Sequence, residues 1–522
     1  MITTTAEAPR SSVSAAFRLA PLALAALLLS NECRADWKFT PLFDLRETYT
    51  DNATQQREEL ARNEWITEAA PGFALTGNTP RLTLSATARW RRFAYSDKAA
   101  DPNLRDGERN YEANGRAMVV DQLFYVDAGA NGRRQSVSAF GQLSDSPYVN
   151  ANRTDVSTWR ISPYLQHRFG STATGEVRFT RDSVDSGFNG FGSSVGSTAS
   201  ASLASGPAFK DLGWNLSYNH QDLSNERAGK STSENAVAGL RYRLIPRLML
   251  TASAGYDDYR YATLGERTSG PSWSVGFAWT PSLRSTVEAS VGHRYFGKTG
   301  SLAASHRTRH SVWSLDYSDQ VITTRSQFLL PAAIDTASML DRLFSASFPD
   351  PVQRQQAIQA YMAATGLPPT LADSINYLSN RYIRAKQLRG AAIFRGARSS
   401  LTFSLFYDKR NALSLQQSDS TLLGSQLGAL NDNVRQRGGN IDADYRLSAR
   451  TTLQASGYLV RAQSIDTGIA NNNRQWRLGL SHTLSAKTQG NIELRHVRGN
   501  YGFDNDSVFH ENAIAATLSV VY

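Results

Sequence analysis

Apolar side chains recur at every second position in short segments along most of this chain. The segment "PSWSVGFAWT" shows the pattern plainly, because small residues separate its large apolar ones: Trp273, Val275, Phe277 and Trp279. Successive side chains point to opposite faces of a β-strand, so this period of two predicts a strand with one apolar face. The same alternation is found in "RLTLSATARW", "SLTFSLFYD" and "NRQWRLGLSHTL". The chain is therefore expected to be all-β.

Clusters of turn-forming residues separate these segments at a nearly constant spacing. They lie at 169–174, 205–213, 244–248, 280–285, 317–321, 447–451 and 484–488. Consecutive clusters are roughly 36 to 38 residues apart within 169–321 and again within 447–488, and a fixed period of this size indicates a repeated structural unit. The unit is a pair of strands followed by a longer connection. Counting such units predicts about 22 strands, within a range of about 18 to 24.

The faces opposite the apolar ones carry charged residues in the middle of the strands. Aromatic residues such as Trp90 and Tyr95 lie near the ends of the apolar faces. A bilayer selects an apolar band bordered by aromatic residues, and only a closed barrel pairs every backbone group in lipid. The pattern predicts a transmembrane antiparallel β-barrel with a polar lumen. The residues expected to face that lumen are Arg81, Arg89, Asp442, Asp444, Arg446, Arg477, Glu493 and Arg495.

The last segment, "ENAIAATLSVVY", has the same alternation and ends on an aromatic residue. Its larger apolar residues share one face: Ile514, Leu518, Val520 and Tyr522. We expect this strand to close the sheet against the first one, with its apolar face in lipid. A terminal aromatic residue after such an alternation also resembles the C-terminal signal that the insertion machinery of bacterial outer-membrane barrels reads.

Residues 1–35 have the pattern of a signal peptide. Arg10 and Arg18 precede the apolar run "LAPLALAALLLS", which is too short to cross a bilayer as a helix. Cleavage is expected after Ala35, and the alternative is a lipoprotein anchored through Cys33. Cleavage leaves residues 36–522 as one barrel domain, exported by a Sec-type route to the outer membrane of a Gram-negative bacterium. It also removes the only cysteine, and with it any disulfide, thiolate nucleophile or Cys-ligated metal.

Charge and composition narrow the function classes further. The net charge of +10 comes from 56 basic and 46 acidic residues that are spread along the chain, and there is no basic block of the kind that binds nucleic acid. Because there is no such block, nucleic acid is not an expected partner. No cofactor or metal site is expected either.

One long segment, 331–380, interrupts the strand rhythm. Asp350, Pro351 and Gly366 are placed as a cap, a first helical residue and a stop, and a second short helix is expected after Thr370. By strand parity this segment is an extracellular loop. It can fold inward as a constriction or lie on the surface as an insert. A second stretch, 188–200, is rich in Gly and Ser and is expected to be a flexible loop.

Three groups of residues could suggest hydrolytic chemistry. Ser194 lies in a G-x-S-x-G sequence, His220 precedes Ser224 by four residues, and Asp257 is followed by Asp258. Ser194 is expected in a Gly/Ser-rich loop and lacks the strand–turn–helix setting that its motif needs. His220 and Ser224 would be about 13 Å apart in a strand, whereas proton transfer needs hydrogen-bond contact. Adjacent acids such as Asp257 and Asp258 are common at loop ends. We expect a non-enzymatic protein. A barrel-embedded lipid or peptide hydrolase and a receptor or scaffold that uses the 331–380 loop remain as alternatives.

The N-terminal region 45–77 resembles a known family. The residues that carry the resemblance are "YTDN" (Tyr49–Asn52) and "PG" (Pro71–Gly72), separated by a polar loop and an acid-containing strand. They resemble the outer-membrane β-barrel family associated with the PEP-CTERM/exosortase systems of Gram-negative bacteria, whose members are encoded with exopolysaccharide biosynthesis and export genes. The resemblance implies an envelope or exopolysaccharide context and no known transport activity. The leading hypothesis is a structural or channel component in that context. The partners expected of an outer-membrane barrel are outer-membrane lipid and lipopolysaccharide and the barrel insertion machinery, and the exopolysaccharide context adds polysaccharide or surface-protein export components.

Overall fold

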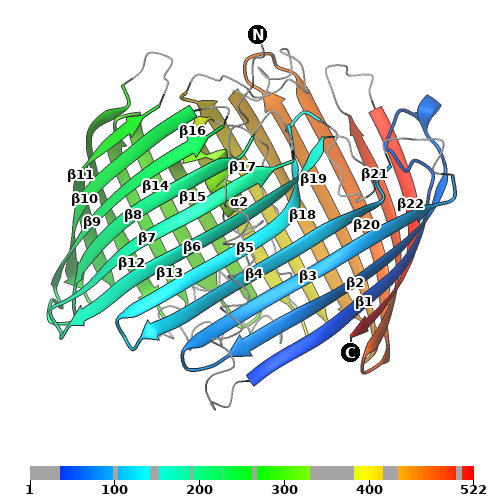
Figure 1. Ribbon diagram of the computed structural model, residues 1–522, viewed down its shortest axis with the longest axis horizontal. Coiled ribbons are helices and arrows are strands. Elements are labelled where there is room, and N and C mark those ends of the chain that lie inside the picture. Colours follow the sequence, from blue (N-terminus) through cyan, green and yellow to red (C-terminus); the bar gives the residue numbers. More distant parts are fainter. Residues whose placement is uncertain are drawn as a thin grey trace, which may run out of the picture.

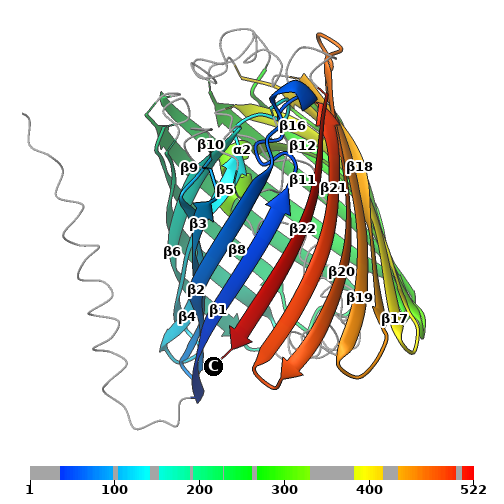
Figure 2. The same ribbon diagram turned by 90° about the vertical axis from the view of Figure 1, so that its right-hand side faces the viewer.

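In the computed structural model 22 strands form one closed antiparallel sheet (Figures 1 and 2). The structure describes residues 36–97, 104–141, 148, 152–187, 192–226, 229–261, 267–329, 381–414, 433–500 and 508–521. The expected signal peptide, the 331–380 loop and Tyr522 lie outside these residues. The predicted all-β barrel of about 22 strands is confirmed.

The strands follow one another around the barrel in chain order. They are β1 (Asp36–Thr50), β2 (Glu64–Asn78), β3 (Leu82–Tyr95), β4 (Gly107–Val120), β5 (Phe124–Ser136), β6 (Arg153–Phe169), β7 (Ala173–Ser186), β8 (Ser194–Ser205), β9 (Leu212–Asn225), β10 (Gly229–Ile245), β11 (Leu248–Arg260), β12 (Ser269–Ser282), β13 (Ser285–Arg294), β14 (Gly297–Arg307), β15 (Ser311–Thr323), β16 (Tyr382–Arg395), β17 (Ser399–Ala412), β18 (Asn433–Arg446), β19 (Thr451–Ser464), β20 (Ala470–Ser485), β21 (Thr488–Asn500) and β22 (Val508–Val521). A 3-10 helix, η1 (Glu58–Leu60), follows β1, and a short helix, α2 (Thr324–Leu329), follows β15.

The sheet closes where the first strand meets the last. β1 pairs antiparallel with β22 over nine residue pairs, from Leu42↔Val521 to Thr50↔Ala513, and the two strands lie side by side in Figure 2. This pairing leaves the sheet without a free edge, so no strand of the sheet keeps a full row of unpaired N–H and C=O groups. The expectation that the last strand closes the barrel against the first agrees with this register.

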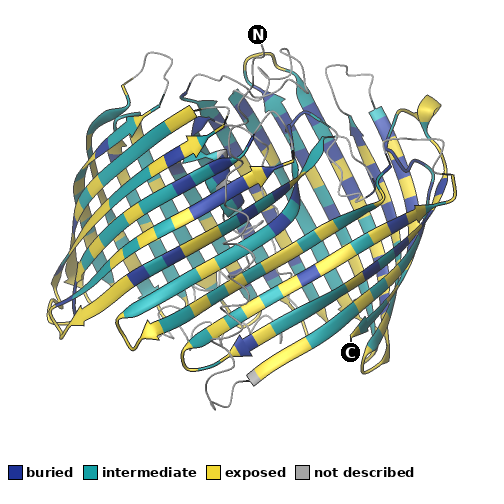
Figure 3. Cartoon of the chain, in the orientation of Figure 1, coloured by how far each residue is buried: buried dark blue, intermediate teal, exposed yellow. Residues whose placement is uncertain are grey.

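Side chains alternate between a large apolar exterior and a polar interior. On β17, Leu405 is 65% exposed on the outside, whereas its neighbour Ser404 is 3% exposed on the inside. The large apolar residues of β12 are likewise exposed outward, namely Trp273, Val275, Phe277 and Trp279, and Figure 3 shows the same alternation of exposure along most strands. Exposed apolar side chains over so large an area are stable only against hydrocarbon, so the exterior is the surface of a membrane-spanning barrel.

The two ends of the barrel differ in their connections. The ten connections at the end where Asp36 and Val521 lie contain two to six residues each, whereas connections at the other end reach 58 residues, between β15 and β16. Gly170 adopts a φ of 58° in the 170–172 turn, a conformation that few other residues tolerate. Short turns mark the periplasmic end of outer-membrane barrels and long loops the outer end.

Two local expectations are wrong. The turn expected at 317–321 lies inside β15, and the observed turn is 308–310. Asp319 stays in the strand because Arg384 and Lys386 on β16 bind its carboxylate, at 2.7 and 3.6 Å. The flexible loop expected at 188–200 contains the first half of β8, where the hydroxyl of Ser194 accepts a hydrogen bond from Arg325.

In the described part of the chain, none of the helices is long and apolar enough to cross a membrane.

Candidate functional site

The connection between β5 and β6 enters the lumen and reaches the far wall. Ala139 and Phe140 are fully buried and pack against Val434 of β18 and Ala462 of β19. The side-chain amide of Asn471 on β20 donates a hydrogen bond of 2.7 Å to the carbonyl of Gly141. Because β18 to β20 lie far from β5 and β6 around the ring, this segment crosses the lumen near its outer end.

Tyr148, in the same connection, packs on the wall formed by β1 to β3. Its ring meets Phe93 edge-on at 5.1 Å, and its hydroxyl lies 3.2 Å from the Thr48 hydroxyl and 3.5 Å from a Glu68 oxygen. Burial and the neighbouring Glu68 carboxylate raise the pKa of Tyr148, so its hydroxyl stays protonated and can donate at neutral pH. The β5–β6 connection therefore touches a second sector of the wall.

Helix α2 lies inside the barrel, against β6 and β7 (Figure 2). It begins directly after β15, yet its side chains contact β6 to β8: Arg325 forms an ion pair with Asp182 and donates a hydrogen bond of 2.7 Å to Ser194. Phe328 is fully buried against Val137, Val156 and Val184. A helix of this length gains little stability by itself, so these anchors hold it in the lumen.

Together the two segments obstruct the outer mouth of the barrel. They rest on wall sectors formed by β1–β3, β6–β8 and β18–β20, and they meet each other where Phe328 packs on Val137. The segment 331–380, for which two arrangements were left open, lies outside the described residues, whereas α2, which precedes it, lies inside the barrel. Such an arrangement can block a hydrophilic passage and release it when the anchors break.

Several of the residues expected to face the lumen lie in ion pairs on the inner wall. Arg89 of β3 binds Asp44 of β1 at 3.0 Å, and Glu493 of β21 binds Arg46 of β1 at 3.0 Å. Arg495 forms a buried ion pair with Glu511 of β22. These pairs link strands one or two positions apart in the sheet and compensate three of the eight candidate charges, namely Arg89, Glu493 and Arg495.

The remaining candidates lie on β18, β20 and one turn. Asp442 and Asp444 accept hydrogen bonds from Asn440 and Ser400, the latter at 3.1 Å. Arg477 pairs in register with Arg495 and so shares its inward face, and Arg446 is exposed at the turn end of β18. Arg81 lies exposed in the turn that precedes β3.

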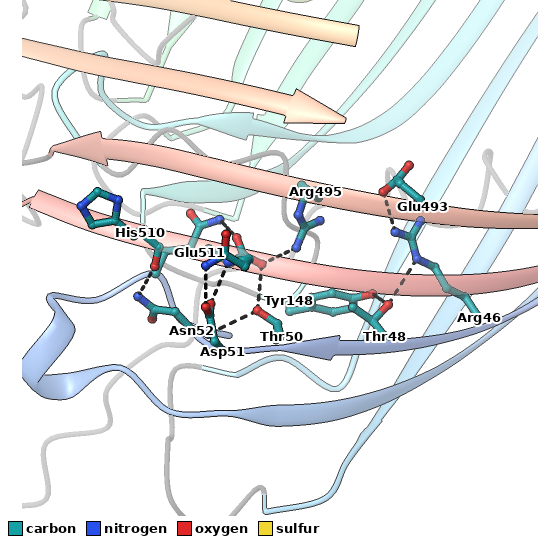
Figure 4. A network of polar contacts seen from close by, with 12 residues as sticks. Arg46, Thr48, Thr50, Asp51, Asn52, Tyr148, Glu493, Arg495, His510 and Glu511 are labelled. Atoms are coloured by element: carbon teal, nitrogen blue, oxygen red, sulfur yellow. Dashed lines mark hydrogen bonds and ion pairs between the residues drawn. The ribbon is translucent and has the colours of Figure 1, made fainter. Parts of the chain in front are cut away.

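Polar contacts on the inner wall lock the junction of β1 and β22 (Figure 4). Glu511 is fully buried and accepts hydrogen bonds from Thr50, at 3.1 Å, and from Gln55 and Arg495. A carboxylate with three donors, one of them cationic, is stable inside a protein because its charge is fully compensated.

The "YTDN" sequence has a structural role at this junction. Asp51 accepts two hydrogen bonds of 2.7 Å from the backbone and side chain of Asn512. The Asn52 side chain donates to the carbonyls of Gln56 and His510, at 2.7 and 2.8 Å (Figure 4). The motif thus joins the end of β1 to the start of β22.

The residues expected to form the C-terminal signal lie on the outer face of β22 as far as the structure describes them. Ile514 pairs with Tyr49, Leu518 with Leu45 and Val520 with Phe43 in the register of β1. Ile514 and Leu518 are 46% and 41% exposed. These side chains therefore contribute to the lipid-facing surface at the junction.

The residues considered for hydrolysis are not assembled for catalysis. Asp257 faces the lumen and is bound by Arg294 at 2.6 and 2.8 Å, while Asp258 faces outward and is bound by Arg260. His220 also faces outward, where it contacts Asp222 at 3.1 Å. Within the described residues no group of three or more His, Cys, Asp or Glu side chains could hold a metal ion.

The residues that close the mouth carry no sequence signal. Phe140, Tyr148 and Arg325 lie in connections without periodic pattern, and their partners are on distant strands. The one clue was the length of the connections, because long connections in a compact fold are usually functional.

Comparison with known proteins places the fold. No family model matches the sequence, and no curated protein matches it significantly. The FrpB iron transporter from Neisseria meningitidis is similar in structure, with 10% identity, 92% of this chain and 82% of that chain covered, and a TM-score of 0.50. The siderophore receptor PirA from Pseudomonas aeruginosa has 12% identity over 93% of this chain and 80% of that chain, with a TM-score of 0.46. The ferric enterobactin receptor PfeA from the same organism has the same identity, coverage and TM-score. At this identity the likeness concerns the fold, a large β-barrel of the outer-membrane type.

Proposed function

We propose that this protein is a gated outer-membrane passage for a hydrophilic polymer or solute, in the exopolysaccharide or PEP-CTERM/exosortase context that the "YTDN" resemblance implies. The observation that carries the gate is the crossing of the outer mouth by two segments that are anchored on opposite walls. A 22-stranded barrel has a lumen too wide for wall side chains alone to fill. The crossing segments therefore decide whether the passage is open.

Polar contacts anchor the crossing segments in addition to the apolar clusters around Phe140 and Phe328. On one wall Arg325 binds Asp182, and on the other Asn471 binds the carbonyl of Gly141. A buried ion pair contributes little net stability. Removal of one partner, however, leaves the other charge buried and uncompensated, which costs about 3 to 5 kcal/mol of stability. Replacement of Arg325 therefore destabilises the closed state, because opening lets water reach Asp182.

The test is single-channel recording from the purified protein in planar bilayers. The unmodified protein is expected to be closed for most of the time. Arg325→Ala should raise the ratio of open to closed time by about a hundred-fold, the equivalent of about 3 kcal/mol. Arg181→Ala is the matched control, because Arg181 belongs to the same strand as Asp182 but bonds Ser197 on the outer face.

Equal conductance in the two variants and the unmodified protein would exclude a gate at this place. A large, steady conductance of the unmodified protein would mean that the mouth is open despite the crossing segments.

The polysaccharide context has its own test. Deletion of the gene in its source bacterium should lower the amount of secreted polymer at least several-fold, and a plasmid copy of the unmodified gene should restore it. Normal secretion after deletion would leave the gate intact but reject this cargo.

A surface receptor is a second candidate, favoured by a cavity of about 760 Å³ at the outer ends of β3 to β7. Arginines such as Arg92, Arg105 and Arg109 line it together with Trp90 and Tyr111, and the acids Asp106, Glu108, Asp155 and Asp185 line it as well. Such a lining suits a small zwitterionic ligand with an apolar part. In a receptor, removal of 331–380 or a change of Arg92 and Arg109 should abolish ligand capture without a change in conductance.

A further inference from the structure

A group of cations lies on the outward face of the barrel near its outer end, on β16 to β21. The outer basic patch consists of Lys386, Lys409, Arg435, Arg437, Arg461, Arg474 and Arg498. These residues share the outward face because they alternate with buried inward residues such as Asp408 and Gln436. In the same registers, Arg437 lies opposite Tyr407, which is 37% exposed on the exterior.

Like charges stand directly opposite one another in this patch. Lys386 pairs with Lys409, Lys409 pairs in turn with Arg435, and Arg437 pairs with Arg461. One strand further, Arg474 pairs with Arg498. Directly opposed like charges in a sheet repel each other and destabilise it. Four such pairs in one sector indicate a face that is adapted to an anionic ligand.

Acidic groups do not neutralise the patch within the described part of the chain. Lys386 alone has an acidic partner, Asp319, at 3.6 Å at the edge of the patch. The other six cations make no ion pair with a described residue. The arginines of the inner wall are different, since Arg46, Arg89 and Arg495 each have a carboxylate partner.

The surface directly beneath the patch is apolar. Leu405, Leu459, Trp476 and Leu494 lie on the same outward face nearer the middle of the strands, and they are 65%, 54%, 55% and 50% exposed. Six neighbouring strands about 4.8 Å apart make the patch roughly 24 Å wide. A ligand that fits both zones has several anionic groups at the membrane surface and hydrocarbon chains below them.

We propose that the outer basic patch binds the phosphorylated headgroup of lipopolysaccharide in the outer leaflet. The guanidinium groups bind phosphate oxygens in charge-assisted, bidentate hydrogen bonds, and the acyl chains pack on the leucines and Trp476. The ligand offsets the repulsion within the patch. The proposal depends on location in an outer membrane and not on the gate or its cargo.

The experiment compares lipopolysaccharide binding and thermal unfolding of the purified full chain in neutral detergent. The test variant is Arg437→Gln/Arg461→Gln/Arg474→Gln. The matched control is Arg284→Gln/Arg398→Gln/Arg450→Gln, which removes the same charge from exposed turns at the other end. The unmodified protein should bind lipopolysaccharide at least tenfold more tightly than the test variant, and the control should bind like the unmodified protein.

The change in melting temperature of the test variant should have opposite signs without and with lipopolysaccharide, which would not be the case if the patch only stabilised the fold. Without lipopolysaccharide the test variant should melt at the same temperature as the unmodified protein or higher, because two repulsive pairs are relieved. With lipopolysaccharide the order should reverse. A lower melting temperature of the test variant under both conditions, or equal binding by all three proteins, would overturn the proposal.

Two further ligands distinguish binding of the phosphorylated glycolipid from binding of free phosphate. Dephosphorylated lipopolysaccharide should bind at least tenfold more weakly than the intact form. Inorganic phosphate at the same phosphate concentration should not raise the melting temperature. If inorganic phosphate reproduces the whole shift, or if dephosphorylation has no effect, the patch does not recognise this glycolipid. If the triple variant does not fold, Arg437→Gln alone, between Tyr407 and Arg461, serves in its place.

Discussion

At the scale of single residues, charge inside this barrel serves mainly to hold strands together. Glu511 joins β22 to β1 and β21 through Thr50 and Arg495, and Asp257 joins β11 to β13 through Arg294. Both acids are fully buried. A buried acid of this kind is costly to alter, since its cationic partner then loses its compensation.

Replacement of Glu511 should show this cost directly. Glu511→Gln leaves Arg495 buried without a carboxylate, and the free energy of unfolding should fall by about 3 kcal/mol or more. The measurement is urea unfolding of the barrel in lipid vesicles. Glu59→Gln, a change in the exposed turn of η1, should alter it by less than about 0.5 kcal/mol. A loss of the same size in both variants would contradict the assigned role.

The two adjacent acids on β11 offer a sharper comparison. Asp257→Asn should destabilise the barrel by about 2 kcal/mol because Arg294, which is 27% exposed, loses its fully buried carboxylate partner. Asp258→Asn removes a more exposed pair worth about 1 kcal/mol or less. Unfolding in urea distinguishes them. Lipid or peptide hydrolysis should also be measured. If the unmodified protein hydrolyses either substrate and Asp257→Asn does not, the hydrolase alternative is restored.

At the scale of elements, alternation in the sequence determined most of what could be foreseen. The outward residues of β12 and β22 follow directly from the period of two, because a shift of one residue would put every apolar side chain into the lumen. The turns near 170, 246 and 283 were identifiable from glycine, proline and polar residues. The false turn at 317–321 shows the limit: Asp319 looks like a turn residue until its partners on β16 are known.

A pair of neighbouring substitutions tests the two faces of one strand. Val291 of β13 is 63% exposed on the outside, and Ser290 faces the lumen beside Ser301. Val291→Arg should cost about 2 to 4 kcal/mol because a cation near the middle of the bilayer is unfavourable. Ser290→Arg should cost much less, since the lumen is polar. Equal losses on unfolding in vesicles would mean that Val291 does not face lipid.

At the scale of the whole molecule, the barrel was predictable and its closed mouth was not. Closure of the sheet follows from strand count and from the absence of any tolerated edge in lipid. The crossing segments depend on contacts such as Phe140 with Val434, between residues almost 300 positions apart. No local pattern encodes such a contact, and the candidate lumen charges were identified without their partners for the same reason.

A disulfide between the crossing segment and the far wall should lock the mouth. Ala139 and Ala462 lie in one buried cluster, and the expected mature chain has no cysteine of its own. In the Arg325→Ala background, the oxidised Ala139→Cys/Ala462→Cys protein should keep its conductance low, and a reductant should raise it. Conductance that does not respond to oxidation would show that ions pass elsewhere.

The meeting of β1 and β22 has a consequence for biogenesis. Leu42 and Val521 are neighbours in the finished sheet, so β1 cannot complete its pairing until all the strands that follow it, including β22, have been synthesised. Bringing the ends of so long a chain together costs about 5 kcal/mol of conformational entropy. The hairpins that form between neighbouring strands do not offset this cost before the two ends meet. One edge of β1 therefore stays unpaired until β22 is available, and the polar cluster around Glu511 forms only when these two strands meet.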